Sequence, residues 1–207
     1  VRPILDLKER ADVERMKSIA DGALEMVMEY GGAWSGEHGD GLVRGPYLER
    51  FFGPQIYQAL RDVKALFDPR TRMNPDKIVD TPPMDSSLRH SPGQGTPEYE
   101  TVFDFSDTLG VLRAAEKCNG SGDCRKGPGA GGTMCPSYMA TREEKHTPRA
   151  RANILRQILT SPADPDRPFD SEEIKEVMDL CLSCKACKSE CPSSVDMSKL
   201  KAEFLQQ

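Results

Sequence analysis

Apolar residues recur at i, i+3 and i+4 in several stretches of the chain, which is the spacing of an amphipathic helix. The first stretch, residues 12–30, has Asp12 as its expected N-cap and a glycine pair starting at Gly31 as its expected stop. A second stretch starts at Pro54, a residue favoured at the first position of a helix, and runs to Phe67. The amino-terminal third is therefore predicted to be helical.

The same spacing returns near the carboxy terminus. Asp170 and Glu173 form a predicted capping box for a helix that leads into Cys181. Asp196 is the expected cap of a last helix. The pattern thus predicts a mainly α fold for the second half as well.

The middle of the chain is predicted to connect two domains. Residues 81–100 are rich in proline, glycine and serine, as is typical of an extended connector. Residues 101–105 alternate apolar and polar positions, so a short strand is possible there, and a short helix is expected over 107–117. We predict three parts: residues 1–80, a linker over 81–117, and a domain over 118–207.

The composition limits the classes of protein to consider. Hydrophobic residues make up 37% of the 207 residues, and no apolar run is long enough to span a bilayer. The net charge is −5 with no basic block, which argues against a nucleic-acid partner. The sequence starts at Val1 without a methionine and stops at Gln207 inside an expected helix, so we expect it to be part of a longer polypeptide.

All seven cysteines lie after residue 117, and four of them form the run C-x2-C-x2-C-x3-C-P between Cys181 and Pro192. This spacing is typical of a [4Fe–4S] cluster, because the first three thiolates converge on one centre while the fourth serves a neighbouring cluster. A zinc site would more naturally show two C-x2-C pairs with a spacer, although a zinc-stabilised module stays an alternative. The segregated cysteines indicate metal ligation in a reducing compartment.

An incomplete copy of this motif lies upstream. Cys118 and Cys124 occupy its first and third places, and Ser121 stands where the second cysteine would be. Cys135 keeps the fourth place, before Pro136, after a longer glycine-rich loop. The upstream motif is therefore one thiolate short.

Two-cluster proteins exchange their fourth ligands between the two motifs. That rule predicts two ligand sets: Cys135, Cys181, Cys184 and Cys187 for a complete cluster, and Cys118, Cys124 and Cys191 for the other. The missing ligand of the second set could be the Ser121 hydroxyl, water or a residue outside the chain, and a [3Fe–4S] cluster would need none. A single cluster, with Cys118 and Cys124 as ordinary thiols, remains an alternative.

A helix is expected after Thr147-Pro148, between the two cysteine groups, with its apolar residues on one side. It also carries Arg149, Arg151 and Arg156. These arginines are predicted to form a solvated or ion-paired face. The alternative is that they offset the negative charge of the clusters.

A glycine-rich string, Ser35-Gly-Glu-His-Gly-Asp-Gly-Leu-Val-Arg44, lies between the first two helices. By itself its Glu37-His38 pair is weak evidence, because an ordinary loop histidine would give the same pattern. Together with Phe67-Asp-Pro-Arg-Thr-Arg-Met-Asn-Pro-Asp-Lys-Ile78, however, the string resembles the carboxy-terminal end of the FAD-linked oxidases. That family includes D-lactate dehydrogenase, glycolate oxidase and D-2-hydroxyglutarate dehydrogenase. Asp76 departs from the family, which commonly has glycine there.

This resemblance implies roles for three residues. Glu37 would be a ligand of a divalent metal, zinc or manganese, where one is present, and His38 would contact the substrate as its base. Asn74 would contribute to binding FAD, most of which would be bound by residues upstream of this chain. A base with a pKa near neutrality suits removal of a hydroxyl proton, and a metal can polarise that hydroxyl.

The cysteine-containing half resembles the helical two-cluster ferredoxin domain of the iron–sulfur subunits of glycolate oxidase and anaerobic glycerol-3-phosphate dehydrogenase. The whole chain looks most like the large fused D-2-hydroxyglutarate dehydrogenases. The implied fold is mainly α, with the carboxy-terminal end of an FAD-linked oxidase followed by a helical two-[4Fe–4S] ferredoxin-like domain.

The implied function is oxidation of a D-2-hydroxy acid, best D-2-hydroxyglutarate to 2-oxoglutarate. Electrons would then pass one at a time through the clusters to a quinone or another acceptor. Alternatives are D-lactate or glycolate as substrate, or an electron-carrier subunit with no catalytic site. The expected location is the cytoplasm or the inner face of the membrane.

Overall fold

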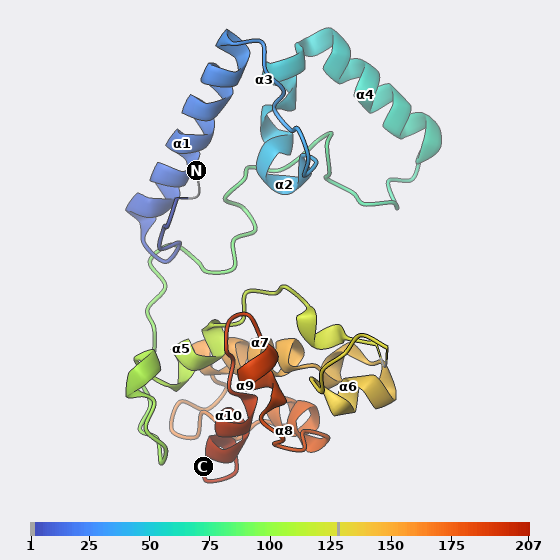
Figure 1. The fold of residues 1–207 in the computed structure, drawn as a ribbon. Helices are drawn as coiled ribbons and strands as arrows, with labels where there is room; N and C mark the ends of the chain where they lie inside the picture. Colours follow the sequence, from blue (N-terminus) through green and yellow to red (C-terminus); the bar gives the residue numbers. More distant parts are fainter. Residues whose placement is uncertain (1–2, 128) are drawn as a thin grey trace. The chain divides into compact units, whose positions relative to one another are not determined.

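The computed structural model describes residues 3–127 and 129–207, which contain helices and no strand. These residues form two compact units, one ending at Gly95 and the other spanning Thr96–Gln207 (Figure 1). The mainly α fold class is confirmed. The division falls inside the predicted linker 81–117, whose later residues pack with the second unit.

The described residues of the first unit form two longer helices, the first and the last, and three short ones. Its elements are α1 (Arg10–Glu29), α2 (Gly41–Arg44), the 3-10 helix η1 (Gly45–Tyr47), α3 (Leu48–Phe52) and α4 (Pro54–Phe67). The α4 helix has the predicted bounds. The predicted N-cap of α1 is wrong, because the helix starts at Arg10 and the Asp12 carboxylate instead accepts the Asp6 N–H, at 2.8 Å.

The buried core of the first unit is small. Its main cluster consists of Leu48, Tyr57 and Val79, with Trp34 and Leu60 packed against it, and Val13 and Leu24 of α1 are also buried. The Tyr57 hydroxyl accepts the Asp80 N–H at 3.0 Å and so ties the end of the segment to α4. Most of the apolar stripe of α4 therefore lies outside this core.

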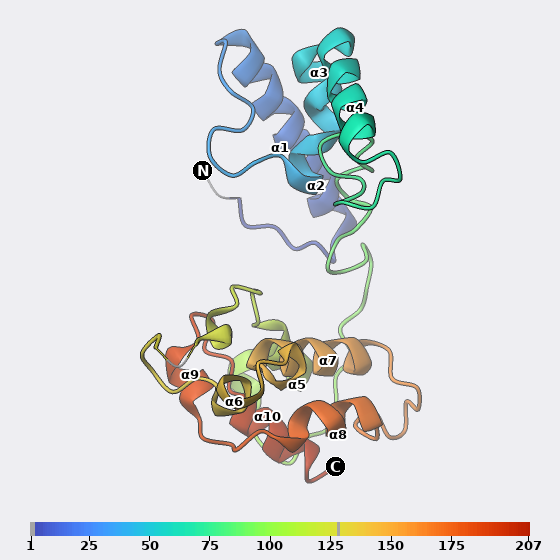
Figure 2. The same cartoon turned by 90° about the vertical axis from the view of Figure 1, so that its right-hand side faces the viewer.

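The second unit is a helical cluster around α7. Its elements are η2 (Ser106–Thr108), α5 (Val111–Glu116), η3 (Asp123–Arg125), α6 (Pro136–Thr141), η4 (Glu144–His146), α7 (Pro148–Thr160), α8 (Glu172–Asp179), α9 (Ala186–Glu190) and α10 (Met197–Phe204). The α7 helix packs against α5, α8 and α10, and Figure 2 shows α7 and α8 side by side. Leu155, Leu159 and Ile174, from α7 and α8, are completely buried in this core.

The caps of these helices follow the sequence with one exception. The Asp196 side chain caps α10, as predicted. The α7 helix starts at Pro148, as expected, and the Thr147 side chain caps it. The predicted capping box at Asp170 is wrong by one residue, because the Ser171 hydroxyl accepts the Ile174 N–H, at 3.3 Å, and lies 2.7 Å from a Glu173 carboxylate oxygen.

The short strand considered for residues 101–105 is absent from this described segment. Its backbone is held by a side chain instead: the carboxylate of the fully buried Glu203 accepts the N–H groups of Val102, at 3.0 Å, and Phe103, at 2.9 Å. A carboxylate on α10 thus replaces the partner strand that this segment would need.

Replacing Glu203 with alanine is expected to lower the free energy of unfolding of the second unit by about 1–3 kcal/mol, because the two N–H groups lose their acceptor. Urea unfolding followed by circular dichroism measures this difference. The exposed Glu100 offers a matched control, and Glu100→Ala should stay within about 0.5 kcal/mol of the wild type. An unchanged unfolding midpoint for Glu203→Ala would mean that water replaces the carboxylate without cost.

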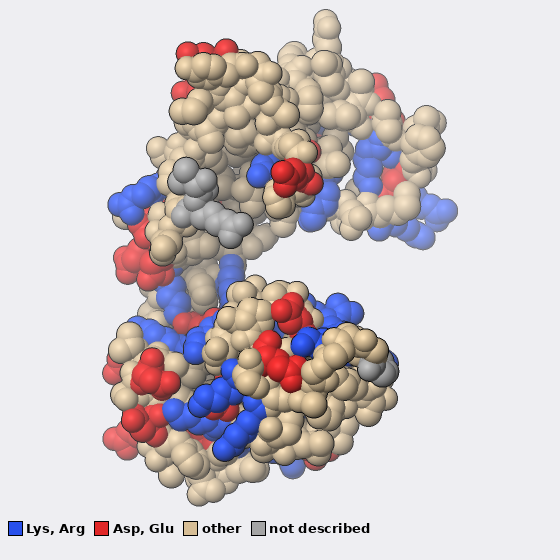
Figure 3. Space-filling model, in the orientation of Figure 1, with Lys and Arg blue, Asp and Glu red and all other residues tan. Residues whose placement is uncertain are grey.

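On the face visible in Figure 3, lysine and arginine side chains lie among aspartate and glutamate side chains in both units. None of the described helices has the length and apolar composition that crossing a bilayer requires.

Candidate functional site

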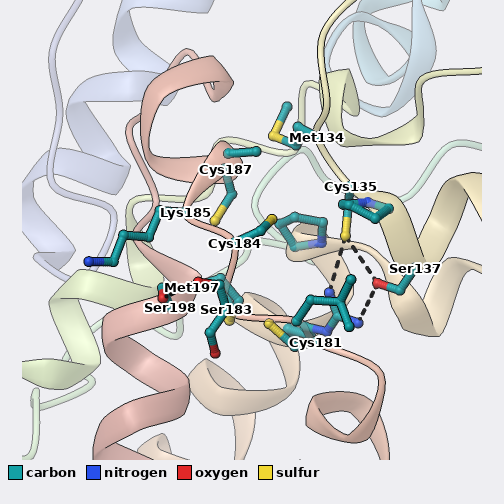
Figure 4. Close-up of a pocket in the computed structure, with 15 residues that line it drawn as sticks. Met134, Cys135, Ser137, Cys181, Ser183, Cys184, Lys185, Cys187, Met197 and Ser198 are labelled. Carbon is teal, nitrogen blue, oxygen red and sulfur yellow. Dashed lines mark hydrogen bonds between the residues drawn. The ribbon is translucent and has the colours of Figure 1, made fainter.

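Four thiols line a single pocket of the second unit (Figure 4). Cys135 immediately precedes α6, Cys181 and Cys184 lie in the loop between α8 and α9, and Cys187 is in α9. All seven cysteines of the chain are described, and none forms a disulfide. Four free thiols around one pocket are the donor set that a [4Fe–4S] cluster takes, so these residues fit that group.

The loop between α8 and α9 explains how the downstream thiols reach one pocket. Ser183 and Lys185 both have positive φ angles, 51° and 64°. Each left-handed residue turns the backbone away from its previous direction. The cysteines therefore do not all project from one face of a helix or of an extended segment. Lys201 supports the loop from α10, because its ammonium group donates to the carbonyls of Met178, at 2.8 Å, and Cys181, at 2.7 Å.

The spacing of the thiols differs from that of a site for one ion. Among the described residues, no three His, Cys, Asp or Glu side chains are grouped closely enough to hold one metal ion. A cubane takes one thiolate at each of four irons, so its ligands stand around it and do not converge on one point. The pocket therefore suits a cluster better than a zinc ion.

Cys135 has the most polar surroundings of the pocket thiols. Its sulfur lies 3.1 Å from Ser137 Oγ and 3.4 Å from an Arg151 guanidinium nitrogen. Burial acts to raise the pKa of Cys135, but hydrogen bonds from Ser137, the Tyr138 N–H and Arg151 outweigh it, so the pKa falls below its usual value. Cys187 differs, because burial dominates and raises its pKa.

Backbone N–H groups at the starts of helices face three of the cysteines. The Tyr138 N–H of α6 acts to lower the pKa of Cys135, and the Arg149 N–H of α7 acts in the same direction on the pKa of Cys124. The N–H groups of Met197 and Ser198, at the start of α10, act to lower the pKa of Cys187. Such N–H groups favour negative charge on the sulfur atoms.

The upstream cysteines form a less complete group. Cys118 and Cys124 are buried and close enough for their charges to interact, whereas Cys191 directly follows α9 and is half-buried. Ser121 is exposed, and its N–H is bound by Asn119 Oδ1 at 3.0 Å. The missing fourth ligand stays open.

The prediction that the α7 arginines form a solvated or ion-paired face is wrong for Arg151, which is completely buried. Arg149 does form an ion pair, at 2.8 Å, with Glu144. Arg151 lies four positions before the buried Leu155, so helical spacing could have placed it on the inner face.

Glu190 is a positioning residue that the sequence reasoning missed. Its carboxylate accepts the Thr133 N–H at 2.8 Å and the Lys126 ammonium at 3.1 Å. These contacts, the Thr133 N–H first, lower the pKa of Glu190 to about 2. The carboxylate thereby joins the loop before Cys135 to α9, which carries Cys187.

A second candidate site is a groove of ≈ 710 Å³ in the first unit. His38 and Asn74, predicted from separate parts of the sequence, both line it. The apolar stripe of α4 forms one wall, with Leu60, Val63 and Phe67. Apolar residues of α4 that lie outside the core thus line this groove.

The loop that carries Asn74 has an unusual backbone. Asn74, Asp76 and Ile78 have positive φ angles of 46°, 58° and 69°. Glycine adopts this conformation without strain, whereas most other residues do not. Aspartate is among the residues that tolerate this conformation, so Asp76 fits the backbone found here.

Glu37 and His38 lie in the loop between α1 and α2. Their side chains are 86% and 79% exposed, with 3.7 Å between a Glu37 carboxylate oxygen and His38 Nε2. The described residues bring no further metal ligands to Glu37. The predicted roles of Glu37, His38 and Asn74 stay predictions.

Asp68 holds the loop that forms the groove. Its carboxylate accepts the Lys64 ammonium at 2.7 Å and the N–H groups of Arg72, at 2.9 Å, and Met73, at 2.8 Å. The bond from Lys64 is the main cause that lowers the pKa of Asp68 to about 2, with the two N–H bonds next. The hydrophobic pattern, which ends this helix at Phe67, does not predict the role of Asp68.

Acid is expected to open this loop. Because the pKa of Asp68 is lower in the folded than in the unfolded chain, its contribution is complete above about pH 4 and is lost as the pH falls toward 2. The protection of the Arg72 and Met73 amides against hydrogen exchange, measured relative to their intrinsic exchange rates at each pH, should therefore fall over this range. Asp68→Asn should show the faster exchange already at pH 6, and equal rates in both proteins would contradict the assignment.

Comparison with known proteins matches each unit to a family. Residues 1–78 match the family described as FAD linked oxidases, C-terminal domain, and residues 117–196 match the 4Fe-4S dicluster domain. No solved structure matches the chain.

Individual relatives match over the whole chain. It is 34% identical to D-2-hydroxyglutarate dehydrogenase of Haemophilus influenzae over 99% of its length, and 33% identical to that of Escherichia coli over 100%. The chain spans 23% of the length of each. A third of the chain is 33% identical to a probable glycolate oxidase iron-sulfur subunit of Bacillus subtilis, covering 15% of that protein.

Proposed function

We propose that this chain, in which residues 1–78 are a C-terminal domain of the FAD-linked oxidases and residues 117–196 a 4Fe-4S dicluster domain, is part of a D-2-hydroxy acid dehydrogenase. D-2-Hydroxyglutarate is the proposed substrate, because the relatives that match the whole chain carry that name. The proposed product is 2-oxoglutarate.

The observation that carries the proposal is that one chain holds a groove with His38 and Asn74 and a pocket with four thiols. FAD, when bound, accepts a hydride, and iron–sulfur clusters carry single electrons. A protein with both can therefore oxidise an alcohol and pass the electrons on singly. The electron acceptor, a quinone or another carrier, remains part of the proposal.

In the groove, His38 is the proposed base. Its imidazole Nε2 would take the proton of the substrate hydroxyl while the hydrogen on C2 departs as hydride. Asn74 offers an amide for hydrogen bonds to FAD, and the apolar wall of α4 would exclude water. Glu37 is proposed to be a ligand of a divalent metal, with the other ligands supplied from outside residues 1–207.

In the pocket, Cys135, Cys181, Cys184 and Cys187 are the proposed ligands of one [4Fe–4S] cluster. Cys118, Cys124 and Cys191 are the proposed ligands of a second. A location in the cytoplasm or at the inner face of the membrane is proposed, because all seven cysteines lie after residue 117, as is typical of metal ligation in a reducing compartment.

The test is anaerobic mixing of the complete protein that contains this chain with candidate substrates, while flavin absorbance is followed. D-2-Hydroxyglutarate should bleach the flavin faster than D-lactate or glycolate do. Faster bleaching by either of these would replace the proposed substrate. A protein that contains clusters but no flavin would instead be an electron carrier.

A further inference from the structure

Arg151 is the largest buried cation in the second unit and lies against the proposed cluster pocket. It is 0% exposed and lines the pocket with Cys135. Its guanidinium donates to three groups: the Val177 carbonyl at 2.6 Å, Ser137 Oγ at 2.9 Å and Cys135 Sγ at 3.4 Å. Figure 4 shows the bonds that converge near the Cys135 sulfur.

The charge of Arg151 is not balanced by a carboxylate. Among the described residues, its partners are a carbonyl, a hydroxyl and a sulfur, and none of these is a carboxylate. A buried charge without a counter-charge is strongly unfavourable. Arginine side chains keep their charge in proteins, so neutralisation does not relieve this cost. An anion beside it is therefore needed.

The pocket offers that anion once it holds a cluster. Four thiolates and four sulfides carry more negative charge than the irons balance, and one-electron reduction adds a further negative charge. We propose that Arg151 is the buried counter-charge of this cluster and favours its reduced form, thereby raising its reduction potential. This inference rests on the proposed cluster in the Cys135 pocket.

Two routes connect the guanidinium to the cluster. The direct route is the bond to Cys135 Sγ. The indirect route runs through Ser137, whose hydroxyl accepts from Arg151 and lies 3.1 Å from the same sulfur. Only the forked guanidinium makes these contacts while also reaching Val177, so lysine would keep the charge but lose part of the geometry.

The experiment compares Arg151→Met and Arg151→Lys with the wild type, using the 207-residue chain reconstituted anaerobically with iron and sulfide. EPR-monitored redox titration gives the potential of each cluster, and the signal of this pocket is the one that Cys184→Ser removes. In Arg151→Met the reduction equilibrium constant should fall tenfold or more, about 59 mV for each tenfold. The reduction equilibrium constant of Arg151→Lys should lie between those of Arg151→Met and the wild type.

The control removes a positive charge that faces solvent. Arg142, at the end of α6, is exposed, and its guanidinium lies 5.8 Å from the ring centroid of Tyr138. Arg142→Met should change the reduction equilibrium constant by no more than about twofold, because water screens an exposed charge. A shift as large as that of Arg151→Met would show a general charge effect and overturn the proposal.

The remaining outcomes of the experiment also support or overturn the proposal. A wild-type potential in loaded Arg151→Met would overturn the counter-charge role. Loss of the cluster from Arg151→Met but not from Arg151→Lys would support it, because the charge alone separates the two variants. Loss from both, with folding retained, would make Arg151 a structural clamp. A wild-type chain that takes up no iron and sulfide would refute the cluster proposal and this inference with it.

Discussion

Replacing Cys135 with serine is expected to abolish the same EPR signal that Cys184→Ser abolishes. The two residues belong to different sequence motifs, but they line one pocket. Serine is a weak ligand for iron compared with a thiolate, so a cluster that loses one of four thiolates should be lost or converted to a three-iron form. EPR of each reduced variant, with iron and sulfide analysis, measures the result.

The complementary pair is Cys191→Ser and Cys124→Ser, which should both affect the other signal. Cys191 directly follows α9 and lies only four positions after Cys187, the pocket cysteine that precedes it in the motif. Sequence order alone would therefore group Cys191 with Cys184. If Cys191→Ser and Cys184→Ser remove one and the same signal, the fourth ligands are not exchanged and the proposed assignment fails.

Replacing His38 with alanine in the complete, flavin-containing protein is expected to slow substrate-driven flavin reduction by roughly 10²–10⁴-fold, the usual contribution of a positioned base. Bound FAD should stay unchanged, because His38 is proposed to act on the substrate. The exposed position of His38 on the groove leaves room for a substrate to reach it. Stopped-flow absorbance of the reductive half-reaction measures the rate.

Two further variants separate the base from its neighbours. Glu37→Ala should lose activity together with bound metal, and excess metal should restore part of it. His90→Ala, outside the residues that line the groove, should reduce its flavin at the wild-type rate. Normal flavin reduction in His38→Ala would make His38 a structural loop residue and move the base to another part of the protein.

The sequence predicted the helices best where a cap and an apolar stripe agreed. The α4 helix starts at Pro54 and ends at Phe67, as the pattern indicated. At α8 the first acidic residue of an apparent capping box was chosen, but the next residue, Ser171, caps the helix. Local motifs allow such one-residue shifts, because adjacent polar residues compete for the same N–H groups.

The pattern of hydrophobic and polar residues did not predict contacts between segments that are distant in the sequence. An alternation of apolar and polar residues at 101–105 suggested a strand, yet Glu203, a hundred residues later, binds its N–H groups. A periodic pattern of apolar residues does not indicate which distant side chain will bind these N–H groups. The same holds for Glu190, which binds the loop before Cys135 from inside the second cysteine motif.

The candidate sites were predictable in their chemistry and only partly in their surroundings. Cysteine spacing indicated which thiols belong together, because the ligand rule for clusters is itself a spacing rule. The burial of Arg151 was missed, because an arginine in a helix usually faces solvent. The groove that joins His38 and Asn74 depends on the backbone of two loops, which hydrophobic patterns do not describe.

The N–H groups that face Cys135, Cys124 and Cys187 belong to helices whose packing fixes their direction. A dipole that already points at the site of a charge does not have to turn when that charge changes. Water would have to reorient at each such change. Burial of these sulfurs behind oriented peptide groups should thus keep the reorganisation energy of electron transfer small, and so favour rapid exchange with a partner of similar potential.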